Sequence, residues 1–574
     1  MLQHSPGFPR ARSLLTEADL SGLGRASSAA GKPDVFSNVD SHSPSQVGGR
    51  GAGGLAGIEA ALAQTPGVEV VSLQRTPAQP GAHGEWPAPL DSRLQHSLGK
   101  RGIERPYLHQ AQALQAIAEG KDVVLATSTA SGKSLCYQVP IVSAVCGDPR
   151  ARALMLFPTK ALGRDQVRGL RELAGDKVGA AVYDGDTPPG QRRAARARAH
   201  AVATNPDMLH RGLLPHHDRW GAFLANLRYV VIDELHTYRG VFGSHVANIL
   251  RRLWRVCRHH GSQPQIIACS ATIANPRELA CEVSGRDNWE VIDRNTAPAG
   301  ARTFVIVNPE VVDPITGVRG DYLKATRRVA SLFRRAQVST LTFCRTRKAV
   351  ELLTRYLRED EAGVVPDAEG RGVDAAAVAR AQVAVRGYRG GYLPERRREV
   401  EQALVSGDAR MVVTTHALEL GIDIGGLDAV VLAGYPGTRA ATVQRSGRAG
   451  RRASSALTVL VLSSRPLDQV VAADPEFLLG RPPEHARVDP LNPEIFVPHL
   501  RCAAHELPIA ADEDCVGVAR EELEPALDYL AEAGVLRRES SEGQASMYFS
   551  IGAGFPADSV DIRGALEENY TVVE

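Results

Sequence analysis

One short stretch of the chain combines the residue types that bind nucleotide phosphates. It runs from Asp122 to Ser134 and reads DVVLATSTASGKS. Its apolar start predicts a buried strand, its small residues predict a loop, and the apolar segment after Ser134 predicts a helix. In such a strand–loop–helix unit, N–H groups of the loop and of the helix N-terminus face an anion. Lys133 is then expected to reach the β- and γ-phosphates, and the Ser134 hydroxyl to hold Mg²⁺.

The loop departs from the strict pattern G-x-x-x-x-G-K-[ST], because Thr127 stands where the first glycine is expected. A tight glycine turn ahead of a helix is the alternative interpretation. The motifs that follow along the chain favour the phosphate loop. The residues expected to contact the nucleotide are Thr127, Ser128, Thr129, Ala130, Ser131, Gly132, Lys133 and Ser134.

A second predicted strand ends in two carboxylates. The apolar run from Leu227 to Ile232 is followed by Asp233 and Glu234. In nucleotide hydrolases a carboxylate at such a position completes the Mg²⁺ shell, which makes Asp233 a predicted metal ligand together with Ser134. Glu234 is placed to orient and deprotonate the attacking water. Alternatively, the two residues are ordinary acids of a surface loop. The Gly-Lys-Ser motif upstream disfavours that interpretation.

Two more groups suit nucleotide chemistry. Gln110, one element before the phosphate loop, has an amide that can bond both edges of adenine, although a solvated helix glutamine fits the sequence equally well. Near residue 450, Arg448 and Arg451 lie three positions apart and share one face if the segment is helical. Guanidinium groups beside a γ-phosphate act as arginine fingers, which contribute about 10³–10⁵ in rate. A solvated basic turn is the alternative.

The fold class predicted from these patterns is α/β, with two tandem RecA-like parallel sheets. Strands alternate with helices, and the polar motifs fall where strands end, as in doubly wound sheets. After the second sheet, two helices and a hairpin pattern predict a winged-helix module, with a purely structural helical cap as the alternative. The expected parts are a low-complexity, disordered tail at 1–85, a first domain at 86–295, a second at 300–475 and the helical module at 476–574.

Composition excludes several classes of protein. The net charge is +2, so any nucleic-acid surface must be local. The eight cysteines contain no C-x-x-C pair, which predicts neither a zinc site nor a disulfide framework. The N-terminus lacks a secretory pattern, and no apolar run reaches the roughly 18 residues of a membrane span. We therefore expect a cytoplasmic protein without a membrane partner.

The ordered set of motifs resembles that of the superfamily-2 (DEAD/DEAH-box) helicases over about residues 100 to 465. A closer resemblance, to the bacterial mitomycin-repair DNA helicases and their RecQ-type eukaryotic relatives, is carried by TASGKSLCY, DELHTYRGVFGSH and RCAAHELP. Members of that family continue beyond the equivalent of Val573 into a domain with a four-cysteine zinc cluster. This sequence lacks such a cluster. The motifs of the ordered set are Gln110, 132–134 (GKS), 158–160 (PTK), 204–207 (TNPD), 233–236 (DELH), 270–272 (SAT), 414–416 (TTH) and 444–451 (QRSGRAGR).

The resemblance implies roles for named positions. Gln110, Lys133 and Ser134 contact ATP, Asp233 and Glu234 serve Mg²⁺ and water, and Gln444, Arg448 and Arg451 complete the catalytic set. Ser270 and Thr272 couple hydrolysis to domain movement. The residues implied to line a track for one nucleic-acid strand are Pro158, Thr159, Lys160, Thr204, Asn205, Arg345, Thr414 and Thr415.

The implied activity is 3′→5′ translocation on single-stranded DNA with duplex unwinding in DNA repair, driven by ATP and Mg²⁺. DNA-repair nucleases are possible partners, and the protein is expected at the nucleoid when it is engaged on DNA. An RNA helicase is one alternative, since phosphate-gripping motifs do not distinguish the sugars. A non-catalytic nucleic-acid-binding scaffold is another, which the intact Lys133, Asp233 and Glu234 disfavour. Oligomeric state stays open.

Overall fold

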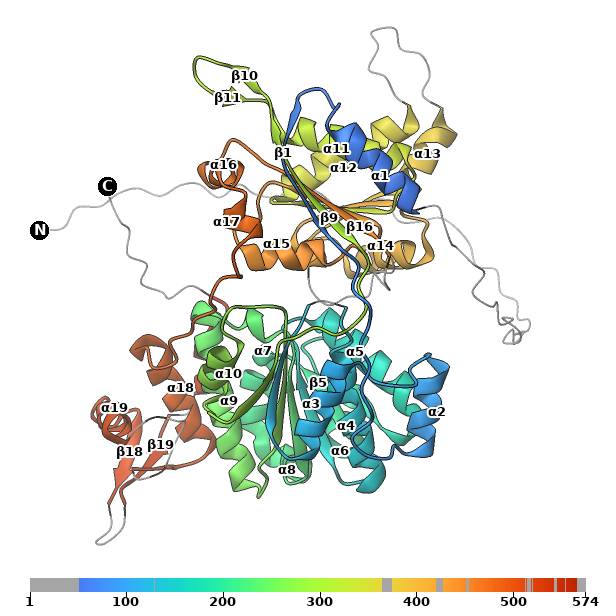
Figure 1. Cartoon of the computed structure of the whole chain (residues 1–574). Coiled ribbons are helices and arrows are strands. Elements are labelled where there is room, and N and C mark those ends of the chain that lie inside the picture. The colour runs from blue at the N-terminus through green and yellow to red at the C-terminus, as the bar shows by residue number, and fades with distance from the viewer. Residues whose placement is uncertain are drawn as a thin grey trace, which may run out of the picture. The chain divides into compact units, whose positions relative to one another are not determined.

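Residues 51–574 are described by the computed structural model, except 129, 364–373, 420–426, 451–453, 512, 514–517, 519, 541–544, 553 and 565–574. Within this part of the chain, the strands form two seven-stranded sheets, one three-stranded sheet and one two-stranded ribbon (Figure 1). No described helix is both long enough and apolar enough to cross a membrane.

The first large sheet is parallel throughout, as the sequence predicts. Its order is β4-β5-β3-β6-β7-β2-β8. Its strands read as short apolar runs because both faces are buried. The strands are β2 (Asp122–Ala126), β3 (Arg152–Leu156), β4 (Ala180–Val182), β5 (Ala201–Thr204), β6 (Leu227–Ile232), β7 (Gln265–Ser270) and β8 (Trp289–Ile292).

Helices cover both faces of this sheet and bury alternate residues of each strand. Val123 and Leu125 pack with one set of helices, whereas Val124 packs with the other. On the first face lie α2 (Ser92–Lys100), α3 (Leu108–Ala118), α4 (Ser134–Gly147) and α5 (Lys160–Ala174). On the second lie α6 (Pro189–Arg198), α8 (Gly221–Leu224), α9 (Gly240–His259) and α10 (Pro276–Ser284), and the short α7 (Pro206–Met208) follows β5.

The register of the sheet brings the polar motifs to one edge. Ala126 at the end of β2 pairs with Ser270 at the end of β7, and Ile232 at the end of β6 pairs with Ala268. The phosphate loop, the carboxylate pair and the Ser-Ala-Thr motif therefore begin from neighbouring strand ends. This edge is where open α/β sheets bind their ligands.

The second large sheet has the order β1-β9-β16-β15-β12-β14-β13. All of its pairings are parallel except that of β1 with β9. Its strands are β1 (Val68–Thr76), β9 (Arg302–Pro309), β12 (Thr340–Cys344), β13 (Val385–Tyr388), β14 (Met411–Thr414), β15 (Ala429–Ala433) and β16 (Ala456–Val461). A ribbon of β10 (Val311–Asp313) and β11 (Val318–Arg319) follows β9.

Helices cover this sheet as well. One face packs against α1 (Gly51–Leu62), α11 (Tyr322–Arg335) and α12 (Arg347–Ala362). The other packs against α14 (Pro394–Ser406), α16 (Pro466–Ala473) and α17 (Glu476–Leu479). Two further helices, α13 (Ala375–Ala384) and α15 (Arg439–Ser446), precede β13 and β16.

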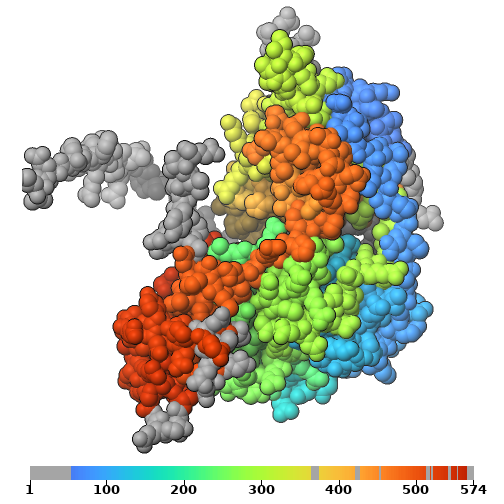
Figure 2. Space-filling view, turned by 60° about the vertical axis from the view of Figure 1, so that its left-hand side comes forward, coloured from blue at the N-terminus to red at the C-terminus, as the bar shows by residue number. Residues whose placement is uncertain are grey.

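The predicted boundary of the tail at residue 85 is wrong. Residues 51–76 form α1 and β1, and β1 is the antiparallel edge strand of the second sheet (Figure 2, blue). Leu55, Ile58 and Leu62 are buried against residues of α11 and β9. The sequence showed apolar residues at 58–62 and 68–73, but the partners that bury them lie more than two hundred positions later. Residues 77–85 are described as well, with β-bridges from Gln79 to Ala299 and from His83 to Tyr107, whereas residues 1–50 of the predicted tail are outside the described residues.

The C-terminal module confirms the winged-helix prediction. It contains two helices and a three-stranded antiparallel sheet of order β17-β19-β18. Phe496, Leu523 and Tyr548 share its small hydrophobic core. Its elements are α18 (Pro493–Glu506), β17 (Ile509–Ala510), α19 (Arg520–Glu532), β18 (Leu536–Glu539) and β19 (Met547–Ser550).

A buried polar network fixes α18 to α9 of the first domain. Arg252 on α9 is fully buried and pairs with the buried Glu506 on α18, with Nε 3.1 Å from Oε2. Its Nη1 lies 2.9 Å from Nδ1 of His210 and 3.0 Å from Nδ1 of His499. Burial lowers the pKa of both histidines, that of His210 to about 2. Both rings are therefore neutral and accept from the guanidinium.

Removing Arg252 should be strongly destabilising. Arg252→Met leaves the Glu506 carboxylate buried without a cation, which typically lowers the free energy of unfolding by about 3–5 kcal/mol. The double variant Arg252→Met/Glu506→Gln removes both charges and should be more stable than the single variant. Arg335→Met, at the exposed end of α11, should stay within about 0.5 kcal/mol of the parent. Unfolding in guanidinium chloride followed by circular dichroism measures these differences, and a single variant as stable as the parent contradicts the network.

Candidate active site

The phosphate loop joins β2 to α4, as predicted. Lys133 folds back over it, and its Nζ donates to the carbonyl oxygens of Thr127 at 2.8 Å and Ser128 at 2.9 Å. Ala130 and Gly132 adopt left-handed backbone conformations, with φ of 63° and 79°. Such conformations turn successive N–H groups toward a common point and make an anion-binding concavity. Among the described residues, no carboxylate is within ion-pair distance of Lys133, so its charge remains available for a phosphate. Thr129 lies outside the described residues.

Gln110 supports the loop from the start of α3. Its Oε1 accepts from the Tyr107 N–H at 2.8 Å, and its Nε2 donates to the Gly132 carbonyl at 3.0 Å. A Cβ at position 132 would lie only 2.5 Å from Nε2 of Gln110, so a glycine is needed there for the close approach as well as for its positive φ. Both ends of the amide bond the chain in this structure. The predicted contact with adenine stays a prediction.

Asp233 and Glu234 follow β6, as predicted. The Glu234 N–H donates to Oδ1 of Asp233 at 3.0 Å, and Glu234 has a left-handed backbone with φ of 53°. Burial, followed by the charge of Glu234, raises the pKa of Asp233 to about 7. Two neighbouring acids in a buried site call for a cation, and hard carboxylate and hydroxyl oxygens suit Mg²⁺. Asp233 and the Ser134 hydroxyl therefore fit the metal implied by the fold.

His236, to which the sequence assigned no role of its own, links three motifs. Its Nδ1 accepts from the Ala271 N–H at 3.0 Å, and its Nε2 lies 3.1 Å from the side-chain amide of Gln444. Burial lowers the pKa of His236, so the ring is neutral and carries its proton on Nε2. That proton requires the Gln444 amide to present its oxygen. The contact joins the end of β6, the Ser-Ala-Thr segment after β7, and α15.

The two residues expected to couple hydrolysis to movement flank Ala271. Ser270 is fully buried at the end of β7, and its hydroxyl donates to the Ala271 carbonyl at 2.8 Å. Thr272 is half-buried. Their position next to the N–H that bonds His236 agrees with a coupling role, which stays a prediction.

Arg448 is buried, but the predicted helical face is wrong. Helix α15 ends at Ser446, and Ala449 already forms a β-bridge with Leu427. The turn at Gly447 therefore separates Arg448 from the helix. Its Nε donates to the Glu419 carbonyl at 3.1 Å, and its pKa is lowered by burial although the charge of Glu234 favours the cation. The second predicted finger, Arg451, lies outside the described residues.

In the first half of the predicted nucleic-acid track, two side chains cap helices. Thr159 accepts from the Leu162 N–H at 3.4 Å at the start of α5, and Asn205 accepts from the Met208 N–H at 2.8 Å at the start of α7. Pro158 is buried, and the buried Thr204 hydroxyl donates to the Tyr183 carbonyl. Exposed Lys160 pairs with Asp186 at 2.7 Å. These side chains shape the strand ends, and contacts to a nucleic-acid strand stay a prediction.

In the second half of the track, Arg345 follows β12 and lies 3.5 Å from Asp468. Thr414 and Thr415 at the end of β14 are buried. Since the two threonine side chains are not accessible in this structure, any contact that they make with phosphate goes through the backbone N–H groups. Their role also stays a prediction.

Arg563 of the winged-helix module reaches the first half of the track, which the sequence did not indicate. Its Nη2 donates to the Pro158 carbonyl at 3.2 Å, and its Nε donates to Oδ2 of Asp207 at 2.9 Å. The guanidinium also lies 4.6 Å from the ring centre of Phe242. An isolated arginine near the end of a chain carries no recognisable motif, so only the structure places it here.

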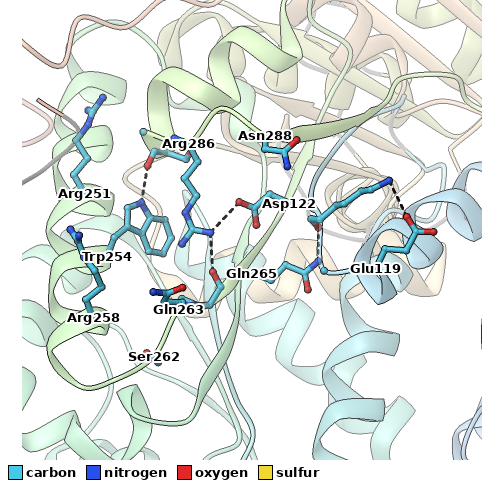
Figure 3. Close-up of a pocket in the computed structure, with 15 residues that line it drawn as sticks. Glu119, Asp122, Arg251, Trp254, Arg258, Ser262, Gln263, Gln265, Arg286 and Asn288 are labelled. Carbon is cyan, nitrogen blue, oxygen red and sulfur yellow. Dashed lines mark hydrogen bonds and ion pairs between the residues drawn. The ribbon is translucent and has the colours of Figure 1, made fainter. Parts of the chain in front are cut away.

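A cavity of about 600 Å³ lies at the other edge of the first sheet, where β2 and β7 begin. Figure 3 shows Arg286 between Trp254 and Asp122. Its guanidinium lies 4.6 Å from the Trp254 ring centre and its Nη1 lies 3.1 Å from Asp122. This cavity contains none of the residues of the phosphate loop, so it is distinct from the candidate active site.

A loop suited to bind phosphate, a carboxylate pair at a strand end, and an arginine and a glutamine from a second domain together define a two-domain P-loop nucleotide hydrolase. A family model described as DEAD/DEAH box helicase matches residues 107–279, and one described as helicase conserved C-terminal domain matches residues 324–453. A third, described as the winged helix domain of ATP-dependent helicase HRQ1, matches residues 488–565. The chain belongs to the superfamily-2 DEAD/DEAH-box helicases and carries an HRQ1-type winged helix.

Two curated relatives are similar over most of this chain. A Bacillus subtilis protein described as an uncharacterized ATP-dependent helicase, YprA, is 44% identical over 492 residues, which are 85% of this chain and 62% of that protein. The ATP-dependent helicase hrq1 of Schizosaccharomyces pombe is 35% identical over 515 residues, which are 88% of this chain and 46% of that protein. This chain therefore spans only part of each relative.

Solved structures agree. The DUF1998 helicase MrfA bound to DNA and AMPPNP is 41% identical, with a TM-score of 0.80 over 90% of this chain and 69% of that chain. The Mycobacterium smegmatis helicase Lhr bound to ssDNA and AMP-PNP is 26% identical, with a TM-score of 0.64 over 80% of this chain and 60% of that chain.

Removing the His236 ring should slow the enzyme without preventing nucleotide binding. His236→Ala removes the ring that bonds both the Ala271 N–H and the Gln444 side chain, but it leaves the phosphate loop intact. We expect a Kd for AMPPNP within about threefold of the parent and a fall in kcat of about 10²-fold, which is typical when catalytic groups are misplaced by about 1 Å. Fluorescent-nucleotide titration and steady-state ATP hydrolysis measure the two quantities. The exposed His96→Ala is the matched control, and an unchanged kcat in His236→Ala contradicts this role.

Proposed function

We propose that the protein is an ATP-dependent DNA translocase and helicase. The single observation that carries the proposal is the contact of Gln444 with His236, because it joins α15 to the motif that holds Asp233 and Glu234. One active site thus draws residues from both α/β domains. ATP binding then favours the joined arrangement, and hydrolysis releases it.

Each residue of the site has a definite part in hydrolysis. Lys133 leaves the loop carbonyls to bind the phosphates, together with N–H groups of the loop. Asp233 and Ser134 are suited to hold Mg²⁺, which neutralises developing charge on the phosphate oxygens. Glu234 accepts the proton of the attacking water. Arg448, positioned by the Glu419 carbonyl, stabilises charge on the γ-phosphate.

DNA is the proposed nucleic acid, because the similar MrfA and Lhr structures were determined with DNA. The strand ends near Pro158 and Asn205 offer backbone N–H groups and helix N-termini, which grip phosphates without reading bases. Binding should therefore tolerate any sequence and weaken as salt rises. The 3′→5′ direction and a role in DNA repair are proposed from the family resemblance.

Glu234→Gln tests the chemistry directly. The amide cannot accept the proton of water, so hydrolysis should fall by at least about 10²-fold while ATP still binds. ATP hydrolysis is measured for the parent and the variant with no nucleic acid, with single-stranded DNA and with single-stranded RNA. Asp218→Asn, an exposed acid elsewhere in the first domain, is the control.

The same experiment separates the possible functions. Stimulation by DNA and not by RNA, lost in Glu234→Gln, supports the proposal and leads to an unwinding assay on a duplex with a 3′ tail. Equal stimulation by RNA instead indicates an RNA-dependent ATPase. Identical behaviour of the parent and Glu234→Gln contradicts a catalytic role and favours a binding scaffold.

A further inference from the structure

The segment between the two α/β domains is paired along its length with a second segment of the chain. Strand β1 pairs with β9 from Val68 opposite Pro309 to Thr76 opposite Arg302. Beyond these strands, Gln79 and Ala299 exchange two backbone hydrogen bonds of 2.8 and 3.0 Å, and the Ala82 N–H donates to the Thr296 carbonyl at 2.9 Å. Figure 1 shows β1 and β9 running side by side. We call residues 79–82 and 295–299 the connector ribbon.

His109 ties the connector ribbon to the phosphate loop. It is fully buried near the start of α3. Its Nε2 lies 3.1 Å from the Ser131 carbonyl, its Nδ1 lies 2.7 Å from the Thr296 hydroxyl, and its own N–H donates to that hydroxyl at 3.0 Å. A carbonyl only accepts, so Nε2 must carry the proton. Nδ1 then accepts from the Thr296 hydroxyl and, at 3.3 Å, from the Thr296 N–H, so the ring links Ser131 to Thr296.

A second bond runs in parallel from the neighbouring residue. The Asn295 side chain donates from Nδ2 to the Ser128 hydroxyl at 2.8 Å, and its Oδ1 accepts from the Ala297 N–H at 3.0 Å. Adjacent residues of the connector ribbon therefore reach the phosphate loop at two points, Asn295 directly at Ser128 and Thr296 through His109 at Ser131. The ribbon is also bonded to α3, since the Leu108 N–H donates to the Ala82 carbonyl at 2.8 Å.

We propose that His109, Asn295 and Thr296 are positioning residues that transmit the state of the phosphate loop to the connector ribbon. The inference rests on the proposed function, because it requires ATP to bind the loop. Lys133 bonds the Ser128 carbonyl in this structure, so its transfer to a phosphate frees the loop at Ser128. The carbonyl released there belongs to the residue whose hydroxyl Asn295 bonds, and the Ser131 carbonyl that His109 bonds lies three residues further along the same loop. The loop and the ribbon therefore change together.

The pairing of the ribbon explains why such a signal reaches the second domain. A single extended strand bends freely, whereas two hydrogen-bonded strands move as a unit. Strand β9 is the second strand of the second sheet and is hydrogen-bonded on both sides, to the edge strand β1 and to β16. A shift at Thr296 is thus carried into a sheet rather than absorbed by a loose segment. By reciprocity, closure of the domains should also alter the affinity of the loop for ATP.

Substitutions at these positions separate the bonds. Thr296→Val removes the hydroxyl at nearly constant volume, and Thr296→Ser restores it. His109→Gln retains an amide N–H that can reach the Ser131 carbonyl but loses the Nδ1 acceptor. Asn295→Ala removes the parallel bond. The exposed Thr316→Val serves as the matched control for loss of a threonine hydroxyl.

The expected result is a split between binding and coupling. In Thr296→Val, the Kd for AMPPNP without DNA should change by less than about threefold, while the stimulation of kcat by DNA should fall about tenfold, within the usual range of coupling. Thr296→Ser should recover most of the stimulation by DNA. A purely structural role instead predicts equal losses of binding, basal rate and stimulated rate, with a lower Tm. That pattern, or unchanged stimulation in Thr296→Val, overturns the inference.

Hydrogen exchange gives a readout that does not depend on turnover. In the parent, AMPPNP should change the exchange of the Gln79, Ala82 and Ala299 amides, which bond across the ribbon. In Thr296→Val it should bind without that change. If AMPPNP binds the parent and the ribbon amides do not respond, the inference fails. If AMPPNP does not bind the parent at all, the proposed function fails instead, and the two outcomes are distinct.

Discussion

Asp233 and Glu234 follow one another at the end of β6, where burial and the charge of Glu234 raise the pKa of Asp233, and this pair sets the demands on the rest of the site. Two acids cannot both be charged away from water unless cations compensate them. Lys133 approaches from the phosphate loop and Arg448 from the turn after α15 of the second domain, and Asp233 with Ser134 suits a metal ion. The parallel sheet supplies the geometry, because β2, β6 and β7 end side by side. Binding of the nucleotide and the metal ion thus completes the set of charges around the two acids, which the side chains alone do not complete.

Local motifs in the sequence predicted most of the first domain. The phosphate loop, the carboxylate pair and the alternation of strands and helices each depend on residues close together in the chain, and all are found. The place of β1 was not predictable, because its partner β9 lies far along the sequence. The helical face proposed for Arg448 failed for a related reason, since a bridge between Ala449 and Leu427 ends the helix early. Arg563 and His109 belong to no motif that spacing reveals, because Asp207 and the Pro158 carbonyl for Arg563, and Thr296 for His109, lie in distant segments.

Buried polar contacts join the parts of the chain at the positions where function requires coordination, and at the winged-helix module they lie beside apolar residues that share the core of the first domain. Arg252 and Glu506 hold the winged helix to α9, His236 contacts Gln444, and His109 joins the phosphate loop to the connector ribbon. Each of these contacts is a directional hydrogen bond or ion pair, so it specifies one arrangement. Apolar packing without directional contacts would allow the packed elements to slide past one another. Such contacts suit a protein in which a change at the bound nucleotide must alter distant contacts with a nucleic-acid strand.

The most direct test is the distance between the two α/β domains in different nucleotide states. Spin labels at Arg168 on α5 and Arg355 on α12, both exposed, report this distance by pulsed electron resonance once Cys146, Cys281 and Cys515 are replaced. A site shared by both domains predicts a shorter and narrower distance distribution with AMPPNP and single-stranded DNA than without them, and no such change in Lys133→Ala. Identical distributions in the parent with and without ligands, under conditions where AMPPNP is bound, would contradict a shared active site.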